Sequence, residues 1–482
     1  MNEKTQWDSQ LAFLFAMIGS AVGLGNIWRF SYVVYSNGGG TFFIPYLIAI
    51  AILGIPFLVL EYGIGYSFKD SFSNVLKKIN PKLEFVSWSL ILFVFIVVIY
   101  YMVILSWDLV YLGSSFTFSW GSDVALYFVK NVGGSSNLSN LTSFIIPTVV
   151  GVLIIWLIVW FISHRDLNDG IGKISKILIP SLFIIMTGIV IYALTLPGAN
   201  IGIQTLLQPD WSKLTDINIW LAAFSQILFS LSMGQAIAIT YASYLPEGSK
   251  LNDNVLLVVL ANCTFEVFTA FGIFSILGFM SFSTGTPMIQ LISEGTGLIF
   301  VVFPMIFNIM GTVGHILAPL LFLAILFAGI TSAVGIFEPM VNSTELKLKW
   351  SRKKTVTVLS IIGCALSLIF TTAVSSYLVG VVDGFVNSFG IMFLIAIQCI
   401  IFAWMYDIDS LIPVINENSR FKVGTVWKVI IKYVLPVFLM VIWLIGVYNL
   451  FLQISTFEMI VYSIILVLVL IFSGILTKIN VN

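Results

Sequence analysis

The chain has 482 residues, of which 59% are hydrophobic and 9% are charged, and its formal net charge is zero at neutral pH. Soluble domains carry roughly 25% charged residues, so this composition excludes an ordinary soluble protein and indicates an integral membrane protein. The chain has no long basic tract, so its charge pattern gives no indication of nucleic acid as a partner.

Twelve segments are predicted to cross the bilayer, because each holds about twenty mostly apolar residues, the length that a helix needs to span the hydrocarbon core. The N-terminus, "MNEKTQWDSQ", lacks the basic region and the cleavage site of a signal peptide, so the first segment is expected to be retained. The predicted spans are residues 11–31, 42–66, 86–112, 143–163, 177–195, 219–245, 255–283, 312–344, 355–375, 379–406, 429–449 and 457–477.

The lysine and arginine residues are distributed unevenly between the two sides of these spans. Of the 22 residues, all except Arg29, Lys130 and Lys213 fall on one side. Because loops rich in Lys and Arg stay on the cytoplasmic side, we expect a multi-pass protein of the cell membrane with both termini in the cytoplasm. The three cysteines lie within predicted spans, which argues against a disulfide framework.

The spans are evenly distributed, so residues 1–482 are expected to form one integral membrane domain. The first and sixth spans contain the interrupted stretches "IGSAVGLGN" and "LFSLSMGQA". Interrupted spans at matching positions of two five-span halves indicate an inverted repeat with a binding site near the bilayer midplane. We expect a first repeat over residues 11–195, a second over 219–406, peripheral spans over 429–477, and a lid formed by the Gly- and Pro-interrupted segment 284–311.

The stretch "GSAVGLGN" suits a cation site. Its small residues allow the backbone to leave helical geometry, and free carbonyl oxygens in a protein-lined cavity are good ligands for a hard cation such as sodium. The glycines could instead serve close helix packing. Asn26 and Asn262 each offer an amide oxygen to such a site, although each alone could make an ordinary interhelical hydrogen bond.

Hydroxyl groups and charged residues elsewhere in the spans are further candidates. Thr331 and Ser332 offer oxygen ligands, but hydroxyl groups in membrane helices often bond back to their own helix. Arg29 and Asp383 would face an outer vestibule, or would extend to the membrane interface.

Two carboxyl groups, those of Glu61 and Glu266, fall within hydrophobic spans. An intramembrane carboxyl group is a functional candidate by default. For Glu61 the alternative is structural, because its carboxylate could accept hydrogen bonds from exposed backbone amides.

No enzyme motif is present. The two histidines, His164 and His315, lie far apart in the sequence. The chain has no HExxH pattern, Walker A loop or nucleophile elbow, so we do not expect an enzyme.

Several segments resemble the neurotransmitter:sodium symporter family. The resemblance covers nearly the whole chain, and it implies an all-α polytopic fold with twelve transmembrane helices, a five-plus-five inverted repeat and broken helices one and six. Its most specific parts are "SAVGLGNIWRF", "NGGGTFFIPY", "GIPFLVLEY", "ITYASY" and "FAGITSA".

Carried over position by position, the resemblance implies two sodium sites and a substrate pocket. The first sodium site uses Ala21, Asn26, Ser230 and Asn262 together with the substrate carboxylate. The second uses Gly19, Val22, Ala328, Thr331 and Ser332. In the substrate pocket, the Tyr101 hydroxyl would hold the carboxylate and Phe229 would form an aromatic lid. The pocket as a whole comprises Ser20, Ala21, Gly23, Gly25, Val97, Tyr101, Phe229, Ser230, Ser232, Gln235, Ser332 and Ile336.

Two positions carry further implications. Monoamine carriers of the family place an aspartate at the position of Gly23, so the glycine implies a substrate that brings its own carboxylate, which means an amino acid. Chloride-dependent members have a neutral residue at the position of Glu266, so its fixed charge would replace chloride. Gln235 departs from the pattern, because a leucine-carrying member of the family has phenylalanine at this position. The polar side chain argues against a pocket that accepts only aliphatic amino acids.

The resemblance also implies gates on both sides of the pocket. Arg29 and Asp383 would close the outer side. The inner gate would comprise Lys4, Trp7, Tyr244 and Glu345. Lys4 replaces an arginine of the family, and the expected aspartate partner aligns with Leu346, next to Glu345.

The sequence therefore predicts a sodium-coupled symporter that imports a neutral, hydrophobic amino acid by alternating access, with two sodium ions and without chloride. Two alternatives remain open. One is a sodium-independent or proton-coupled amino acid exchanger of the same fold. The other is a membrane receptor that binds an amino acid without transporting it.

Overall fold

The computed structural model describes residues 6–292, 295–452 and 454–479. Their regular structure is helical, apart from two isolated bridges. Ten helical segments of this part of the chain are long and apolar enough to cross a membrane, and a bent pair near the N-terminus brings the number to 11. The predicted all-helical, multi-span fold is confirmed. The predicted sixth span falls outside this count because it is divided into two short helices.

The helices of the first predicted half are α1 (Gln10–Ala21), α2 (Leu24–Ile27), α3 (Arg29–Ser36), α4 (Phe43–Ala49), α5 (Ile55–Phe68), α6 (Phe72–Ile79), α7 (Glu84–Ser115), α8 (Val124–Asn131), α9 (Ile146–Ser163) and α10 (Lys173–Leu194). Those of the second are α11 (Ala199–Leu207), α12 (Ile217–Ser230), α13 (Ile237–Ser243), α14 (Leu251–Thr284), α15 (Met288–Leu291), α16 (Phe303–Ile309), α17 (Gly314–Leu348), α18 (Arg352–Ser367), α19 (Ser375–Phe385) and α20 (Met392–Ile400). The chain ends with α21 (Ile408–Asn416), α22 (Thr425–Val429), α23 (Leu435–Phe451) and α24 (Thr456–Lys478).

Short π-helical and 3-10 segments join several of these helices. The π-helical segments are η2 (Ile50–Gly54), η5 (Asn168–Gly172), η7 (Leu298–Val302), η9 (Val386–Ile391), η10 (Ile401–Met405) and η11 (Ile430–Val434). The 3-10 segments are η1 (Gly40–Phe42), η3 (Pro81–Leu83), η4 (Leu138–Asn140), η6 (Trp211–Thr215) and η8 (Leu368–Thr371).

The first span breaks where the sequence places its small residues. Helix α1 ends at Ala21, and Val22 and Gly23 are extended before α2 begins. The axis bends by 67° between α1 and the α2–α3 segment. The break leaves backbone N–H and C=O groups near the middle of the span without helical hydrogen bonds. Lipid offers no hydrogen-bond partner to these groups, whereas a polar cavity does.

The sixth span is interrupted between α12 and α13. Ser232, Gly234 and Ala236 all have positive φ, at 49°, 71° and 64°. The buried carboxylate of Glu61, on α5, accepts the Gly234 amide at 3.2 Å and the Gln398 side-chain amide at 3.0 Å. The structural reading of Glu61 therefore holds, because its carboxylate satisfies an amide of the unwound segment.

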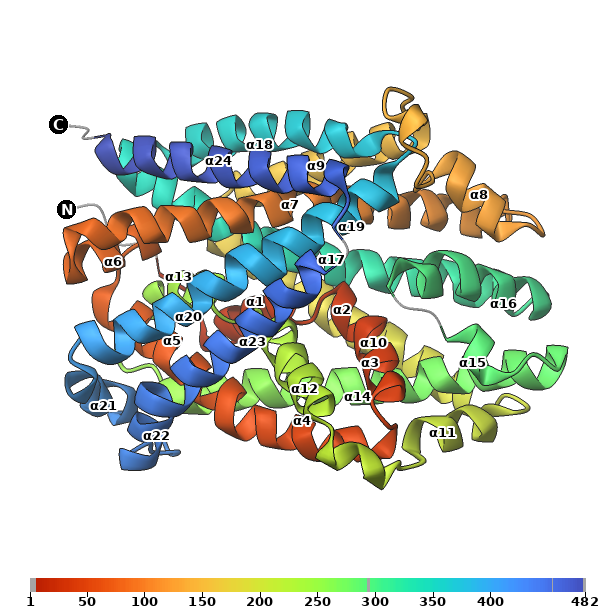
Figure 1. Cartoon of the computed structure of the whole chain (residues 1–482), viewed down its shortest axis with the longest axis horizontal. Helices are drawn as coiled ribbons and strands as arrows, with labels where there is room; N and C mark the ends of the chain where they lie inside the picture. Colours follow the sequence, from red (N-terminus) through yellow and green to blue (C-terminus); the bar gives the residue numbers. More distant parts are fainter. Residues whose placement is uncertain (1–5, 293–294, 453, 480–482) are drawn as a thin grey trace.

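The long helices run roughly along the long axis of the molecule (Figure 1), and the described ends of the chain lie at the same end of it. The connecting helices α6, α21 and α22 lie toward that end, whereas α8, α11, α15 and α16 lie toward the opposite end. The segments that link the spans thus gather at the two ends of the bundle.

The packing between helices repeats in a reciprocal way. Helix α7 packs against α9, as α17 packs against α18. Helix α9 also contacts α17, as α18 contacts α7, and α7 and α17 pack directly against one another. A repeat that relates spans three and four (α7 and α9) to spans eight and nine (α17 and α18) would produce this reciprocal packing. The five-plus-five inverted repeat of the whole chain remains a prediction.

Candidate functional site

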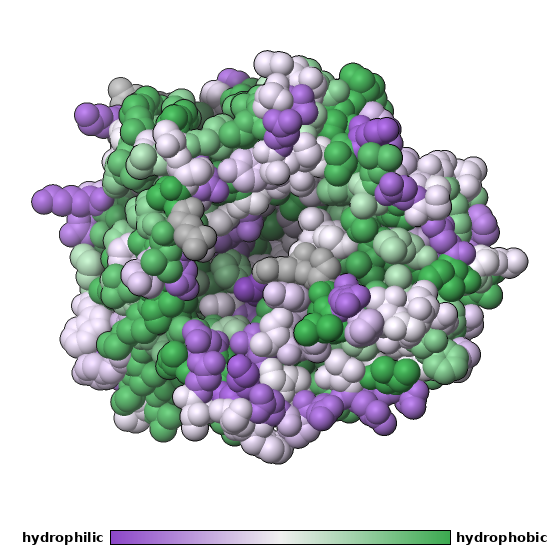
Figure 2. Space-filling model, turned by 45° about the vertical axis from the view of Figure 1, so that its right-hand side comes forward, coloured by the Kyte–Doolittle hydropathy of each residue, from purple (hydrophilic) through white to green (hydrophobic). Residues whose placement is uncertain are grey.

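A cavity of about 550 Å³ lies at the two helix breaks. Its lining comes from the α1–α2 break, the α12–α13 break and the facing sides of α7, α17 and α19. Figure 2 shows the molecule hollowed on the face that turns toward the end with α8, α15 and α16. Polar and charged residues are as common in its lining as apolar ones, so the cavity suits a small molecule that carries polar groups.

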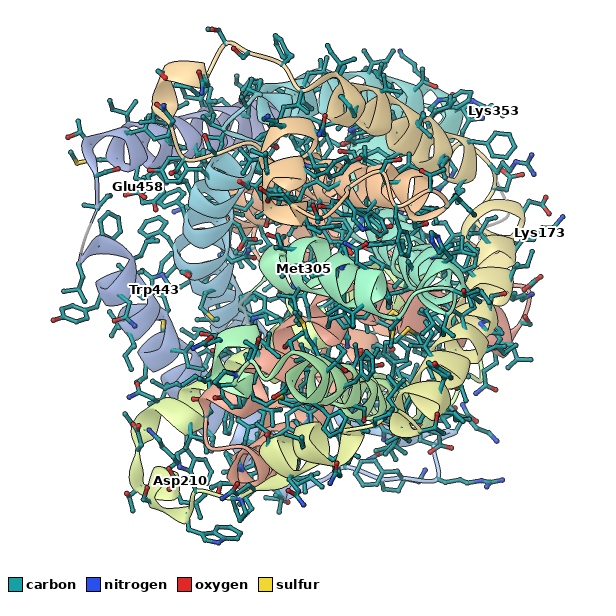
Figure 3. All side chains as sticks on the ribbon, turned by 90° about the vertical axis from the view of Figure 1, so that its right-hand side faces the viewer. Lys173, Asp210, Met305, Lys353, Trp443 and Glu458 are labelled. Carbon is teal, nitrogen blue, oxygen red and sulfur yellow. The ribbon has the colours of Figure 1, made fainter. Side chains whose placement is uncertain are left out.

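The segment between α14 and α17 lies across this end of the molecule. In Figure 3, which views that end, Met305 of α16 is near the middle, and Trp443 and Glu458 lie toward one edge. Gly295 and Thr296 of the same segment line the cavity. The predicted lid segment thus reaches the cavity, and its closing over a substrate remains a prediction.

The predicted substrate residues are gathered around this cavity. All of them line it except Ser20. Ser20 is buried, and its carbonyl oxygen accepts the hydroxyl groups of Ser232 at 2.9 Å and Ser332 at 3.3 Å. Ser20 therefore joins the broken first span to the α12–α13 break and to α17, behind the wall of the cavity.

Gly23 lets the broken first span lie close to two hydroxyl groups at the wall of the cavity. A Cβ atom added to it would lie 3.2 Å from the Ser332 hydroxyl and 3.5 Å from the Tyr101 hydroxyl. The Tyr101 hydroxyl is buried and makes no hydrogen bond of normal geometry among the described residues, although the Ser332 hydroxyl and the Leu24 backbone lie near it. Because a buried hydroxyl without a well-formed hydrogen bond is costly, this group is available to a ligand in the cavity that Tyr101 lines.

Three of the four residues predicted for the first sodium site, Asn26, Ser230 and Asn262, lie in one polar network, and the fourth, Ala21, lines the cavity. Asn26 accepts the Gly23 amide at 2.8 Å through Oδ1, and its Nδ2 donates to Asn262 at 2.8 Å and to Glu266 at 3.1 Å. Asn262 in turn donates to the Ser230 hydroxyl at 2.5 Å. The network brings together amide, hydroxyl and carboxylate oxygens, the ligand types that suit a hard cation.

Two members of this network were not predicted. Gln226 donates to Glu266 at 2.9 Å, and the Tyr46 hydroxyl donates to Glu266 at 2.5 Å. The available signal was spacing, since Gln226 lies four residues before Ser230 and so faces the same side of α12.

At the second predicted sodium site, α1 and α17 lie in close contact. A Cβ atom on Gly19 would be 2.9 Å from Cβ of Thr331, and one on Gly335 would be 2.6 Å from Cβ of Ser20. The Thr331 hydroxyl donates to Phe327 and Ala328 carbonyls of its own helix, at 3.0 Å each. This is the alternative that the sequence left open for Thr331, and a ligand role would require this hydroxyl to reorient.

Arg29 and Asp383 line the same cavity. Arg29 donates to Gln226 at 2.5 Å, and its guanidinium lies 5.1 Å from the ring centre of Phe229. Asp383 accepts the Tyr100 hydroxyl at 2.6 Å and Asn387 at 2.8 Å. The two charged residues thus lie on opposite elements of the cavity wall, where their attraction would draw α2–α3 toward α19.

At the end of the molecule where the chain termini lie, Trp7 packs against α13 and is hydrogen-bonded to it. Its indole Nε1 and its backbone amide donate to the carbonyl oxygens of Tyr241 and Tyr244, each at 2.9 Å. Lys4 lies outside the described residues. No ion pair of Glu345 occurs among the described residues.

A buried ion pair near Tyr244 was missed by the sequence analysis. Arg352 makes two hydrogen bonds of 2.8 Å to the carboxylate of Glu338, which is fully buried. The Tyr244 hydroxyl donates to the same carboxylate at 3.0 Å and accepts from Asn342 at 2.7 Å. No local pattern signals this cluster, because its residues come from α13, α17 and α18.

The segment before α1 is tied to α10. Asp8 is an ion partner of Lys176, with an N–O distance of 3.2 Å. Slight burial opposes ionisation of Asp8, but hydrogen bonds from Lys176 and Ser9 outweigh it and lower the pKa of the carboxyl group below its usual value. The pair is therefore formed at neutral pH and is lost on acidification through that pKa.

Comparison with known proteins identifies the family. A model of the sodium:neurotransmitter symporter family matches residues 4–137 and 122–481. The chain is 40% identical to a protein of Methanocaldococcus jannaschii named as an uncharacterised sodium-dependent transporter, over 91% of this chain and 89% of that protein. It is 27% identical to the sodium-dependent serotonin transporter of Drosophila melanogaster, over 93% of this chain and 77% of that protein. The chain therefore belongs to the sodium:neurotransmitter symporter family and is a sodium-dependent membrane transporter, not an enzyme.

Proposed function

We propose that the protein is a symporter that uses two sodium ions to import a neutral, hydrophobic amino acid by alternating access, without chloride. The observation that carries this proposal is the Tyr101 hydroxyl, which has no hydrogen bond of normal geometry and lies next to Gly23 in the wall of the cavity, where the first span is broken. A hydroxyl donor and free backbone groups at a helix break suit a carboxylate.

The substrate class follows from the charges around this part of the cavity. Gly23 supplies no carboxylate, so a substrate with an amino group alone would find no partner there. An amino acid brings its own carboxylate, which would accept the Tyr101 hydroxyl and complete the first sodium site. Val97 and Ile336 line the cavity and supply apolar surface to the side chain of the substrate.

Coupling has a physical basis in this arrangement. A sodium ion or a carboxylate alone is costly in a cavity of low dielectric constant, whereas together they neutralise one another. Sodium would therefore bind with the amino acid at the site of Asn26, Asn262 and Ser230. The second ion would lie between α1 and α17, near Thr331, and stabilise the broken helix against that span.

Glu266 gives the reason for chloride independence. Its carboxylate lies in the same network as Asn26 and Asn262 and is held there by Tyr46 and Gln226. A fixed negative charge at this place offsets the sodium charge, so a mobile anion is not needed.

Alternating access requires a closure on each side of the site. Arg29, Asp383 and Phe229 would close the cavity on the outer side. Trp7 and Tyr244 would close the side on which the termini lie. The excess of Lys and Arg in loops at that end supports a cytoplasmic position for both termini in the cell membrane.

Uptake by reconstituted vesicles tests the proposal. Purified protein is exposed to a panel of labelled aliphatic, aromatic and polar amino acids, with and without an inward sodium gradient and with chloride or gluconate as the anion. We expect sodium-dependent, chloride-independent accumulation of a neutral hydrophobic amino acid. Uptake indifferent to sodium would favour an exchanger, and binding without uptake would favour a receptor.

A further inference from the structure

One buried acidic side chain has no role in the site described above. Asp108 lies in α7, its side chain has 0% exposure, and neither carboxyl oxygen has a hydrogen-bond partner among the described residues. Buried polar groups in native proteins are almost always hydrogen-bonded, and an unpartnered one calls for a specific explanation.

Asp108 differs in this respect from every other buried carboxyl group in the described part of the chain. Each of the others has hydrogen-bond or ion-pair partners on neighbouring elements. They are Glu61, Glu84, Glu266 and Glu338. The fold accounts for Glu61, Glu84 and Glu338, and the proposed ion site accounts for Glu266, so Asp108 alone among them is unexplained.

The position of Asp108 places it beside the transport cavity. Helix α7 lines the cavity through Tyr101, Ile104 and Trp107, and Asp108 follows directly behind this wall. Asp108 lies seven residues from Tyr101, which is two helical turns along the same face. The indole nitrogen of Trp107 and the hydroxyl of Tyr111 are also buried without a partner, so unpartnered polar groups are concentrated on this part of α7.

The elements that pack here offer Asp108 no counter-charge. Aromatic rings of η7 and α8 contact Trp107, and aromatic rings of η7 and α17 contact Tyr111. Helix α9 also packs along α7. The α9 and η7 segments contain no titratable residue. The titratable groups on the remaining elements are Glu84, Tyr100, Tyr101 and Tyr111 of α7, Tyr127 and Lys130 of α8, His315, Glu338, Glu345 and Lys347 of α17, and Arg29 and Asp383 across the cavity.

These groups are occupied elsewhere or lie at a distance along the helices. Tyr127 shares a hydrogen bond with Ser114, and His315 stacks on Phe118 with 3.8 Å between ring centres. Glu338 and Lys347 form ion pairs near the opposite end of α17. An ionised carboxylate at position 108 would therefore be uncompensated, whereas the protonated acid carries no charge to compensate.

We propose that Asp108 is a proton-binding site that holds a proton in the conformation seen here and releases it when α7 and its neighbours rearrange to admit water. The step is a simple dissociation in which the carboxyl O–H bond breaks, the bonding electrons stay on the oxygen and the proton passes to water. The inference rests on the proposed alternating-access cycle, because it requires a second conformation in which this part of α7 is hydrated.

The sign of the coupling follows from linkage. Protonation stabilises the conformation in which Asp108 is sealed in apolar surroundings, relative to any conformation in which it is hydrated. A high pH therefore shifts the protein away from the conformation seen here. The Asp108→Asn variant keeps the shape of the side chain but cannot ionise, so it should retain that conformation at all pH values.

Infrared spectroscopy of the purified protein tests the protonation state without depending on transport. We expect the carbonyl stretching band of a protonated carboxylic acid at neutral pH in the parent protein and a weaker band in Asp108→Asn, because other buried carboxyl groups contribute to the same band. The matched control is Asp409→Asn, since Asp409 is 58% exposed and ion-paired with Lys428, and this variant should keep the band. A parent spectrum without the band, or an identical band in Asp108→Asn, overturns the proposal.

Cysteine labelling tests the coupling to conformation. Ser388 lines the cavity, and Ser388→Cys provides a reporter whose labelling is compared with that of the parent protein with its native cysteines. At high pH, the Ser388→Cys protein that keeps Asp108 should be labelled at least about threefold less than the Ser388→Cys protein that also carries Asp108→Asn. At low pH the two proteins should be labelled equally. An equal ratio at every pH overturns the coupling. Failure of the proposed function would instead appear as absent sodium-driven uptake, with both of these measurements unaffected.

Discussion

At the residue scale, Gly23 and Tyr101 define what the cavity can accept. Gly23 places no side chain beside the Ser332 and Tyr101 hydroxyl groups, and the Tyr101 hydroxyl has no hydrogen bond of normal geometry among the described residues. An absent side chain and an unused hydroxyl together favour a ligand that carries a carboxylate. Two residue-scale predictions follow from this site, one on the substrate and one on the ion.

Replacing Tyr101 with Phe should weaken amino acid binding without unfolding the protein. The change removes one hydroxyl that has no described protein partner, so the fold loses no hydrogen bond, whereas a bond to a charged ligand group is lost. We expect affinity to fall about 10- to 100-fold, measured by equilibrium binding of labelled amino acid in sodium. Tyr111→Phe is the matched control, because Tyr111 is also buried and unpartnered in α7 but does not line the cavity. Equal losses in both variants would contradict the role of Tyr101.

Replacing Glu266 with Ser should make transport depend on chloride. The variant removes the fixed negative charge and opens space beside Asn26 and Asn262, so an anion from solution is needed to balance sodium. The measurement is sodium-driven uptake in chloride and in gluconate, which should differ in the variant and agree in the parent protein. Full activity of the variant in gluconate would show that Glu266 does not supply this charge.

At the element scale, the two broken spans depend on close contact with intact ones. Helix α13 lies against α5 so closely that a Cβ atom on Gly65 would be 2.2 Å from the carbonyl oxygen of Ile239. Such an approach leaves no room for a side chain, and it holds α13 at the angle that the α12–α13 break requires. The glycine serves packing here, as it does at the α1–α17 contact.

Gly65→Ala should therefore destabilise the protein. The added methyl group forces α5 and α13 apart, and we expect a cost of roughly 1–3 kcal/mol, measured by thermal unfolding in detergent. Gly113→Ala is the matched control, because Gly113 is exposed near the end of α7 with nothing within 4 Å of an added Cβ atom. That variant should be neutral or slightly more stable, since alanine favours helix. Similar stabilities of the two variants would refute the close contact.

At the scale of the whole molecule, the two ends are closed by different chemistry. Toward the end with α8 and α16, Arg29 and Asp383 line an open cavity and have separate polar partners. Toward the end with the termini, Trp7 packs on α13, and Arg352 joins α18 to α17 through Glu338. The structure thus combines a cavity at one end with a buried polar closure at the other.

Removing Arg352 should loosen the closed end. Arg352→Ala leaves the fully buried Glu338 carboxylate without its cation, and we expect a loss of about 3–5 kcal/mol in stability. Adding Glu338→Gln should recover part of the loss, because the unpaired charge is then absent. The exposed pair Lys428–Asp409 provides the contrast, since Lys428→Ala should cost about 1 kcal/mol at most. Thermal unfolding checks stability, and thiol accessibility near Tyr244 checks the closure; unchanged values for Arg352→Ala would exclude this role.

The sequence by itself determined the membrane-spanning class, the positions of most spans and the break in the first span. These features depend on apolar runs and on local glycine and polar patterns, which a chain expresses over a few residues. The resemblance of its motifs to a known family supplied the pocket residues, and all of them except Ser20 line one cavity.

Only the tertiary structure decided which polar side chains are hydrogen-bonded or ion-paired with one another. Glu61 satisfies the amide of Gly234, 173 positions away. Arg352 of α18 forms an ion pair with Glu338 of α17. Asp108 has no hydrogen-bond partner among the described residues. A carboxyl group in a membrane span looks the same in the sequence whether it is structural, ion-paired or unpartnered. Its role depends on the groups that neighbouring helices bring within hydrogen-bond distance, which helix packing sets and the local sequence does not.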